Sequence, residues 1–195
     1  MSYRFFYWPG VFNDVAKYCR RCAVSQKSVK RPKNSKVPLI SVPVVSEPLT
    51  KVAIDIIGPL PKSKKGNRYI LTLVDYATRY PEAVALSTID TETIVDELIK
   101  ICSRVGLPDE ILTDQGLNFT SQLMMDICHC LSVKKLRTTP YHPMCNGLVE
   151  RFNGVLKTML KKYVSKQPNI WDTYLPYLLL AYREVPQATT GLSPF

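Results

Sequence analysis

The chain has 195 residues, of which 46% are hydrophobic and 10% aromatic, and its formal net charge is +10. This composition excludes disorder throughout and fits one well-packed domain with a smaller appendage. So strong a positive charge favours nucleic acid as the partner. Because no apolar run could span a bilayer and the amino terminus is unlike a signal sequence, we expect an intracellular protein with reduced cysteines.

The amino-terminal part of the sequence predicts a short arm followed by a basic linker. Residues 7–27 have the pattern of a helix that ends in a turn. Its apolar face would consist of Val11, Val15 and Tyr18. Residues 28–48 contain several prolines, which resist helix interiors and central strands, and no acid occurs from residue 15 to residue 46. This basic run is either a solvated linker or a phosphate contact, and a domain boundary is predicted near residue 48.

Beyond this boundary, short apolar strands alternate with amphipathic helices. Strands are expected at 52–57, 69–74, 83–86, 110–113 and 133–137. Helices are expected at 91–105, from a cap at Ser121 to Leu131, at 146–163 and at 171–183. A hairpin turn at Gly66 and Asn67 makes the first strands antiparallel. The pattern predicts an α/β fold of ribonuclease-H type, a five-stranded mixed sheet flanked by helices.

The inner faces of two of these helices can be predicted from their periodicity. The helix after Ser121 would turn inward Leu123, Met124, Ile127 and Leu131. The helix over 146–163 would turn inward Val149, Phe152, Val155, Leu156, Met159, Leu160 and Tyr163. Its other stripe consists of Glu150, Asn153, Lys157 and Lys161. One carboxylate therefore shares a helix face with two lysines.

Three carboxylates from distant segments form the candidate site. Asp55 interrupts an apolar strand, where a charge is costly unless it is paired or bound to metal. Asp114 follows the strand at 110–113, and Glu150 begins the polar stripe. Taken singly, each has a structural alternative. Asp55 could be a buried aspartate bonded to backbone donors, Asp114 a turn residue and Glu150 a surface acid. Gathered together they would repel one another unless divalent cations lay among them, and two such ions ~3.5–4 Å apart support in-line phosphoryl transfer.

Four segments around these residues carry a specific pattern. They are residues 54–61 (Ile-Asp-Ile-Ile-Gly-Pro-Leu-Pro), 74–80 (Val-Asp-Tyr-Ala-Thr-Arg-Tyr), 113–119 (Thr-Asp-Gln-Gly-Leu-Asn-Phe), and 139–143 (Thr-Pro-Tyr-His-Pro) leading into 146–153 (Asn-Gly-Leu-Val-Glu-Arg-Phe-Asn). Together they resemble the integrase catalytic domain of retroviruses and, more closely, of gypsy-type long-terminal-repeat retrotransposons. The resemblance implies that Asp55, Asp114 and Glu150 hold Mg²⁺ or Mn²⁺. It also implies that the protein trims the 3′ ends of the element's DNA and uses those hydroxyls to attack target DNA.

The resemblance further implies a DNA-binding surface. The loop at 141–147 corresponds to one that enters DNA beside the active site, and Lys157 matches a basic position that holds phosphate. The implied DNA-binding residues are Tyr141, His142, Asn146, Asn153, Lys157 and Lys161. A solvated helix lysine and a loop histidine without a role are the alternatives for Lys157 and His142. Met144 stands where the family usually carries glutamine, so one polar DNA contact is lost.

Cys19 and Cys22 resemble the second half of the family's His₂Cys₂ zinc-binding amino-terminal domain. The two histidines of the chain, His129 and His142, lie far along the sequence. Four tetrahedral ligands cannot be assembled locally, so no bound zinc is expected and the chain is expected to be truncated upstream. The predicted division is 1–27, a remnant of the zinc domain; 28–48, a basic Pro-rich linker; and 49–195, the catalytic domain.

Three functions are weighed on this basis. The leading one is a metal-dependent polynucleotidyl transferase that acts on DNA in the nucleus, at least as a dimer because integration joins two DNA ends. The second is a domesticated DNA-binding module, which Met144 and the missing zinc half favour and the three retained carboxylates oppose. The third is a ribonuclease-H-like nuclease on RNA–DNA hybrids. That enzyme would need neither the Cys-x-x-Cys arm nor the Pro-Tyr-His-Pro loop.

Overall fold

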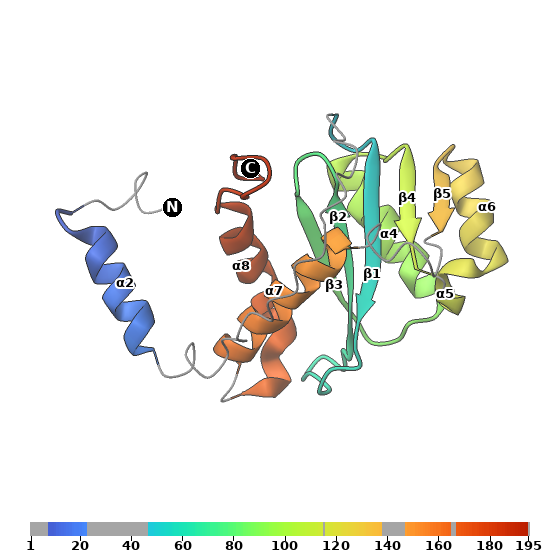
Figure 1. Ribbon diagram of the computed structural model, residues 1–195. Coiled ribbons are helices and arrows are strands. Elements are labelled where there is room, and N and C mark those ends of the chain that lie inside the picture. Colours follow the sequence, from blue (N-terminus) through green and yellow to red (C-terminus); the bar gives the residue numbers. More distant parts are fainter. Residues whose placement is uncertain (1–7, 23–46, 115, 138–146, 165–166, 195) are drawn as a thin grey trace, which may run out of the picture.

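The computed structural model describes residues 8–22, 47–114, 116–137, 147–164 and 167–194 (Figure 1). Most of the predicted linker and most of the predicted DNA loop lie outside these residues. Within them, no helix combines the length and the apolar character that crossing a membrane requires.

Five strands form one mixed sheet in the order β3-β2-β1-β4-β5. The strands are β1 (Lys51–Ile57), β2 (Tyr69–Asp75), β3 (Pro81–Leu86), β4 (Glu110–Thr113) and β5 (Lys134–Arg137). The first three pair antiparallel, whereas β4 runs parallel to β1 and β5 runs parallel to β4. Because helices cover both faces, β1 and β2 are almost continuously apolar instead of alternating with polar residues. The predicted mixed sheet is confirmed.

The described helices are α2 (Val11–Arg21), α4 (Thr91–Val105), α5 (Leu117–Thr120), α6 (Gln122–Cys130), α7 (Gly147–Tyr163), the 3₁₀ helix η2 (Pro168–Ile170) and α8 (Trp171–Arg183). α4, α5 and α6 lie on one face of the sheet and α7 and α8 on the other, whereas α2 lies away from the sheet (Figure 1). Side chains of Asp90 and Ser121 accept the N–H groups of Thr93 and Met124 and so begin α4 and α6. The predicted cap at Ser121 is confirmed.

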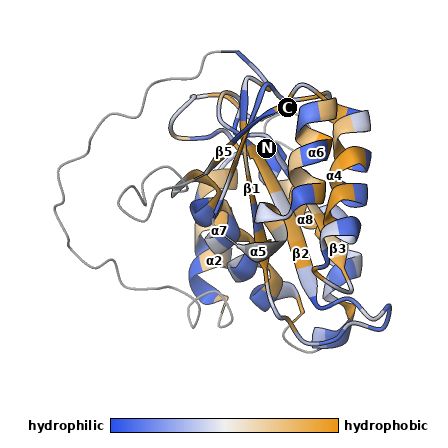
Figure 2. Cartoon of the chain, turned by 90° about the vertical axis from the view of Figure 1, so that its right-hand side faces the viewer, coloured by the Kyte–Doolittle hydropathy of each residue, from blue (hydrophilic) through white to orange (hydrophobic). Residues whose placement is uncertain are grey.

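Each face of the sheet has its own apolar core. Ala53 and Ile57 of β1 face α7 and α8, whereas Val52 and Ile54, which alternate with them, face α4 and α6. Figure 2 shows the apolar residues gathered on the strands between the helices. The alternation along β1 decides which helices any of its side chains can meet.

Several side chains that were predicted to face inward are exposed. They are Val15 and Tyr18 on α2, Leu123 on α6, Leu131 directly after α6, and Val155 and Tyr163 on α7. On α7 the buried residues recur at steps of three and four, as Val149, Phe152, Leu156 and Leu160. A helix lying on a sheet buries only a stripe of this width, so the outer members of a broad apolar set stay in solvent.

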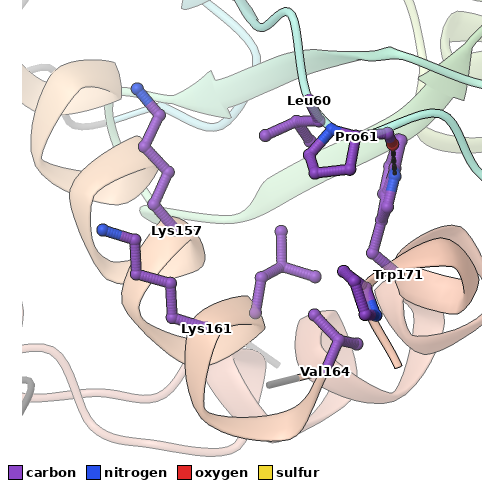
Figure 3. A pocket seen from close by; sticks show the side chains of 8 residues that line it. Leu60, Pro61, Lys157, Lys161, Val164 and Trp171 are labelled. Carbon is purple, nitrogen blue, oxygen red and sulfur yellow. Dashed lines mark hydrogen bonds between the residues drawn. The ribbon is translucent and has the colours of Figure 1, made fainter. Parts of the chain in front are cut away.

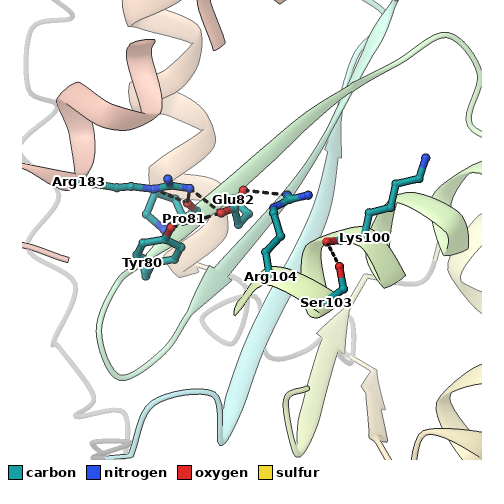
Figure 4. A network of polar contacts seen from close by, with 7 residues as sticks. All are labelled: Tyr80, Pro81, Glu82, Lys100, Ser103, Arg104 and Arg183. Carbon is teal, nitrogen blue, oxygen red and sulfur yellow. Dashed lines mark hydrogen bonds and ion pairs between the residues drawn. The ribbon is translucent and has the colours of Figure 1, made fainter. Parts of the chain in front are cut away.

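One arginine fixes the last helix to the edge strand β3. Arg183 of α8 donates hydrogen bonds to the Pro81 carbonyl (2.7 Å) and to Oε1 of Glu82 (2.8 Å), and its guanidinium carbon lies 4.2 Å from the centroid of the Tyr80 ring. Arg104 of α4 lies 3.5 Å from Oε2 of Glu82. The buried carboxylate therefore joins both helical layers to the same strand (Figure 4).

Candidate active site

The candidate site begins where two parallel strands lie side by side at the centre of the sheet. β1 pairs with β4 in a register that sets Ala53 beside Leu112. Continued for two residues, the same register sets Asp55 beside Asp114. Side chains two residues apart share a face, so both carboxylates lie on the face of Ala53 and Leu112, which α7 and α8 cover.

α7 brings the third carboxylate to this face. Glu150 lies in the first turn of α7 and is exposed, whereas Asn153, one turn later, is 5% exposed. The amide of Asn153 donates a hydrogen bond to Oδ2 of Asp55 at 2.7 Å. This bond ties the start of α7 to the centre of β1. The three carboxylates named from the sequence thus come from three elements that meet on one face.

Electrostatics also connects the three acids. Burial raises the pKa of the Asp55 carboxyl, and the negative charges of Asp114 and Glu150 raise it further. The backbone N–H of Ile56 and the amide of Asn153 act in the opposite direction. A set of three carboxylates supplies only oxygen ligands, which hard divalent cations such as Mg²⁺ prefer. The donor chemistry fits such ions, although the described acids do not form a compact group of three metal ligands.

Asp114 is oriented by the glycine two residues later. The N–H of Gly116 donates to Oδ1 of Asp114 at 3.0 Å, and a Cβ at residue 116 would lie 3.0 Å from the same oxygen. A side chain there would crowd the carboxylate, which explains the glycine in the Asp-Gln-Gly sequence.

Asp75, the last residue of β2, carries another buried carboxylate but lies apart from this site. It pairs with Val52 at the start of β1, and its carboxylate accepts the N–H groups of Leu49 and Thr78 and the Thr78 hydroxyl. With its side chain 2% exposed, Asp75 holds a turn and the entry to β1 in place.

The other predicted site residues fall into three groups. Tyr141, His142, Met144 and Asn146 lie outside the described residues. Lys157 and Lys161 lie exposed on α7, as the polar stripe predicts. Cys19 lies on α2 and Cys22 directly after it, and within the described residues no group of three potential ligands includes them. His129 is exposed on α6.

A polar cluster that was not predicted fixes the loop after β1. Asp172 in the first turn of α8 accepts hydrogen bonds from the Ser63 hydroxyl (2.7 Å) and the Asn67 amide (2.8 Å). The indole N–H of Trp171 donates to the Pro61 carbonyl at 2.7 Å. The one signal in the sequence is an acid in the first turn of a helix, which does not reveal the loop it binds.

A family model for the integrase core domain matches residues 45–143, a span that contains Asp55 and Asp114. The chain belongs to the integrase core domain family. Curated relatives extend the similarity past Glu150. The Pol polyprotein of transposon 412 from Drosophila melanogaster is 27% identical over 193 residues, 98% of this chain and 16% of the relative. The Gag-Pol polyprotein of Walleye dermal sarcoma virus is 35% identical over 154 residues, 78% of this chain and 9% of the relative.

A relative that is not named as a polyprotein is the Gypsy retrotransposon integrase-like protein 1 of Mus musculus, 27% identical over 180 residues, 91% of this chain and 34% of the relative. This integrase core therefore spans a minor part of each of these relatives. Among solved structures, the simian T-cell lymphotropic virus intasome with the PP2A regulatory subunit B56 gamma superposes with a TM-score of 0.67 at 26% identity, covering 89% of this chain and 61% of the other.

The HTLV-2 integrase catalytic core domain in complex with magnesium has the same fold. It superposes with a TM-score of 0.62 at 23% identity and covers 75% of this chain and 94% of its own. The predicted ribonuclease-H-like architecture of an integrase catalytic domain is confirmed.

Proposed function

We propose that this integrase core catalyses metal-dependent polynucleotidyl transfer on DNA, trimming 3′ ends and joining them to target DNA. Asp55, Asp114 and Glu150 would be the metal ligands. The observation that supports the proposal is the parallel register of β1 and β4 beneath α7, which sets Asp55 beside Asp114 on the face that α7, the helix of Glu150, covers.

Some residues of the site would orient the metal ligands, and others would contact the substrate. Mg²⁺ or Mn²⁺ bound there would activate the attacking oxygen and stabilise the departing one. Asn153 fixes the orientation of Asp55, and Gly116 fixes that of Asp114. Glu150 is exposed and can approach a phosphodiester from the helix side. The magnesium complex of the HTLV-2 catalytic core supports this choice of ion.

We also propose the setting in which the site acts. DNA would contact Lys157 and Lys161 on α7, together with Tyr141, His142 and Asn146. Residues 1–27 would be the remnant of a zinc domain, 28–48 a basic linker and 49–195 the catalytic domain. The protein would act in the nucleus as at least a dimer, which the dimeric and trimeric forms of the HTLV-2 core support.

The test is the cutting and rejoining of a branched DNA that mimics the integration product, with Mn²⁺ or Mg²⁺ present. We expect metal-dependent joining by the wild type and none by Glu150→Gln, because the amide keeps the shape of the side chain and removes its charge. The variant should fold like the wild type, and its dissociation constant for DNA should stay within about twofold of the wild-type value. Glu92→Gln is the matched control, since Glu92 is exposed in the first turn of α4 on the opposite face. Equal activity of wild type and Glu150→Gln would contradict the assignment.

A domesticated DNA-binding module is the second candidate, and Met144 is the observation that favours it. Met144→Gln restores the polar residue that the family usually carries and should raise joining activity if the loop acts as proposed. A wild type and a Met144→Gln variant that both bind DNA and never cut or join it would favour the binding module.

A further inference from the structure

A cavity of about 360 Å³ lies beside α7, on the side of the sheet that carries the candidate site. Its walls come from the loop after β1, the second half of α7, η2 and the start of α8 (Figure 3). The lining residues are Leu60, Pro61, Lys157, Leu160, Lys161, Val164, Pro168 and Trp171. Apart from the two lysines they are apolar at the surface of the cavity, and the Trp171 indole N–H is already bonded to Pro61.

The walls of the cavity are held in place by hydrogen bonds between elements. Besides the bond from Trp171, the N–H of Lys64 donates to the Asn169 carbonyl at 2.7 Å. Asp172 binds Ser63 and Asn67 as described above. The loop after β1 is therefore joined to η2 and α8 at several points. A ligand would enter a preformed space, which lowers the entropic cost of binding.

The mouth of the cavity is positively charged on one side. The stems of Lys157 and Lys161 line the wall, and their ammonium groups lie together at the same side of the opening (Figure 3). Neither lysine forms an ion pair with a carboxylate of the described residues. Like charges four residues apart on a helix repel each other, so an anion at the mouth would be stabilised by both. The cavity thus suits a ligand with a flat apolar part and an adjoining anionic part.

We propose that this cavity binds one unpaired nucleobase of a DNA strand, with the flanking phosphates on Lys157 and Lys161. This inference rests on the proposed function, because it takes DNA as the substrate. Lys157 lies ~10 Å along α7 from Glu150, counted at the helical rise per residue. That span corresponds to about three nucleotide steps of ~3.4 Å. A strand cleaved beside Glu150 would therefore pass the mouth of the cavity.

The size and chemistry of the cavity define which nucleotide fits. A volume of about 360 Å³ lies at the small end of ligand pockets and has room for one ring system, not for a base pair. A base inside a duplex would first have to leave its stack, which is least costly for a base without a partner. The apolar walls offer few hydrogen-bond partners, so binding should tolerate any base, as stacking sites do.

The proposal is tested by the affinity of the full chain for two DNAs without divalent ions. One is a blunt duplex. The other is the same duplex with a short single-stranded extension, prepared once as a 3′ and once as a 5′ extension. We expect the extension to tighten binding roughly five- to tenfold, the low end for contacts to a single base, because the walls are mostly aliphatic. A fluorescent 2-aminopurine moved along the extension should report burial at one position only.

Two variants of the cavity wall test whether the gain in affinity from the extension arises in the cavity. Leu60→Trp fills the space from a half-buried position, and Pro168→Asp places a negative charge at its exposed edge. Either should reduce the affinity for the extended DNA to the wild-type affinity for the blunt duplex. Lys161→Ala should lower the gain. Lys162→Ala, which removes the same charge from the next residue of α7 outside the cavity lining, should retain it.

Four outcomes would overturn the proposal. Equal affinity for the two DNAs, or a gain that survives in both Leu60→Trp and Pro168→Asp, would exclude the cavity and leave DNA binding intact. Binding of an acidic peptide with an apolar anchor that Leu60→Trp abolishes, without any gain from the extension, would assign the cavity to a peptide. Failure to bind either DNA would remove the proposed function together with this inference.

Discussion

Asn153 shows how burial changes the role of a polar residue. The sequence places Asn153 on the same stripe as Glu150, as a candidate for DNA contact. In the structure, Glu150 is exposed whereas Asn153 is buried and bonded to Asp55. The oxygen of this amide, Oδ1, is also buried and has no hydrogen-bond partner among the described residues. A buried polar atom in this state calls for an explanation such as strain or a catalytic role, and this one lies beside the candidate metal ligands.

Removing this amide should weaken catalysis without weakening DNA binding. In Asn153→Ala, Asp55 loses its orienting bond, so we expect activity to fall about 10- to 100-fold and more Mg²⁺ to be needed for half-maximal rate. The dissociation constant for DNA should change less than twofold. Titration of joining activity with Mg²⁺, beside a DNA-binding titration, checks both.

Thr158→Ala is the matched control for this prediction. It removes a polar side chain of α7 whose hydroxyl, among the described residues, bonds only to the helix's own Gly154 carbonyl. This variant should keep the wild-type metal dependence. If Asn153→Ala lost DNA affinity in proportion to activity, the result would instead support a direct contact between Asn153 and DNA.

At the scale of elements, periodicity predicted most of the fold. The strands of the sheet and the helices at 91–105 and 171–183 were predicted within two residues of their ends, because their apolar spacing and caps are local properties. The one-turn helix α5 was not predicted, since four residues carry too little periodicity. The support of Asp55 by Asn153 and of the loop by Asp172 could not be predicted either, because these bonds join elements that only the folded sheet brings together.

The buried contacts of Glu82 with Arg183 and Arg104 should stabilise the fold far more than an exposed ion pair does. Arg183→Ala would remove the nearest cation from a buried carboxylate, which would keep Arg104 at 3.5 Å and the Tyr80 hydroxyl at 3.4 Å, so we expect the free energy of unfolding to fall by about 2–4 kcal/mol. Lys100→Ala, which breaks an exposed pair with Glu97, should leave the free energy of unfolding nearly unchanged. Urea unfolding measures both. Equal losses of unfolding free energy in the two variants would show that the buried contacts of Glu82 stabilise the fold no more than the exposed pair.

At the scale of the molecule, the positive charge should govern how tightly DNA is held. Phosphate contacts release bound counterions, so the dissociation constant should rise at least tenfold between about 50 and 200 mM salt. Lys157→Ala and Lys161→Ala should each reduce the slope of log affinity against log salt by roughly one. Titration of a labelled duplex at several salt concentrations measures this slope.

A charge-matched control separates a specific surface from net charge. Lys100 lies on α4, on the face opposite the candidate site, so Lys100→Ala should leave the slope near that of the wild type. If all three lysine variants shifted the slope alike, DNA would be held by the overall field and not by the stripe on α7.

The dependence of the site on three distant segments also affects when it can act during synthesis. A ribosome completes β1 and β4 well before it reaches α7, so the emerging chain carries two of the acids and lacks the third. Closing the long loops from Asp55 to Glu150 is slow compared with forming local helices. Nucleic acid near the ribosome would therefore meet a polypeptide without the assembled site, and the proposed cleavage would become possible only after α7 has docked on the finished sheet.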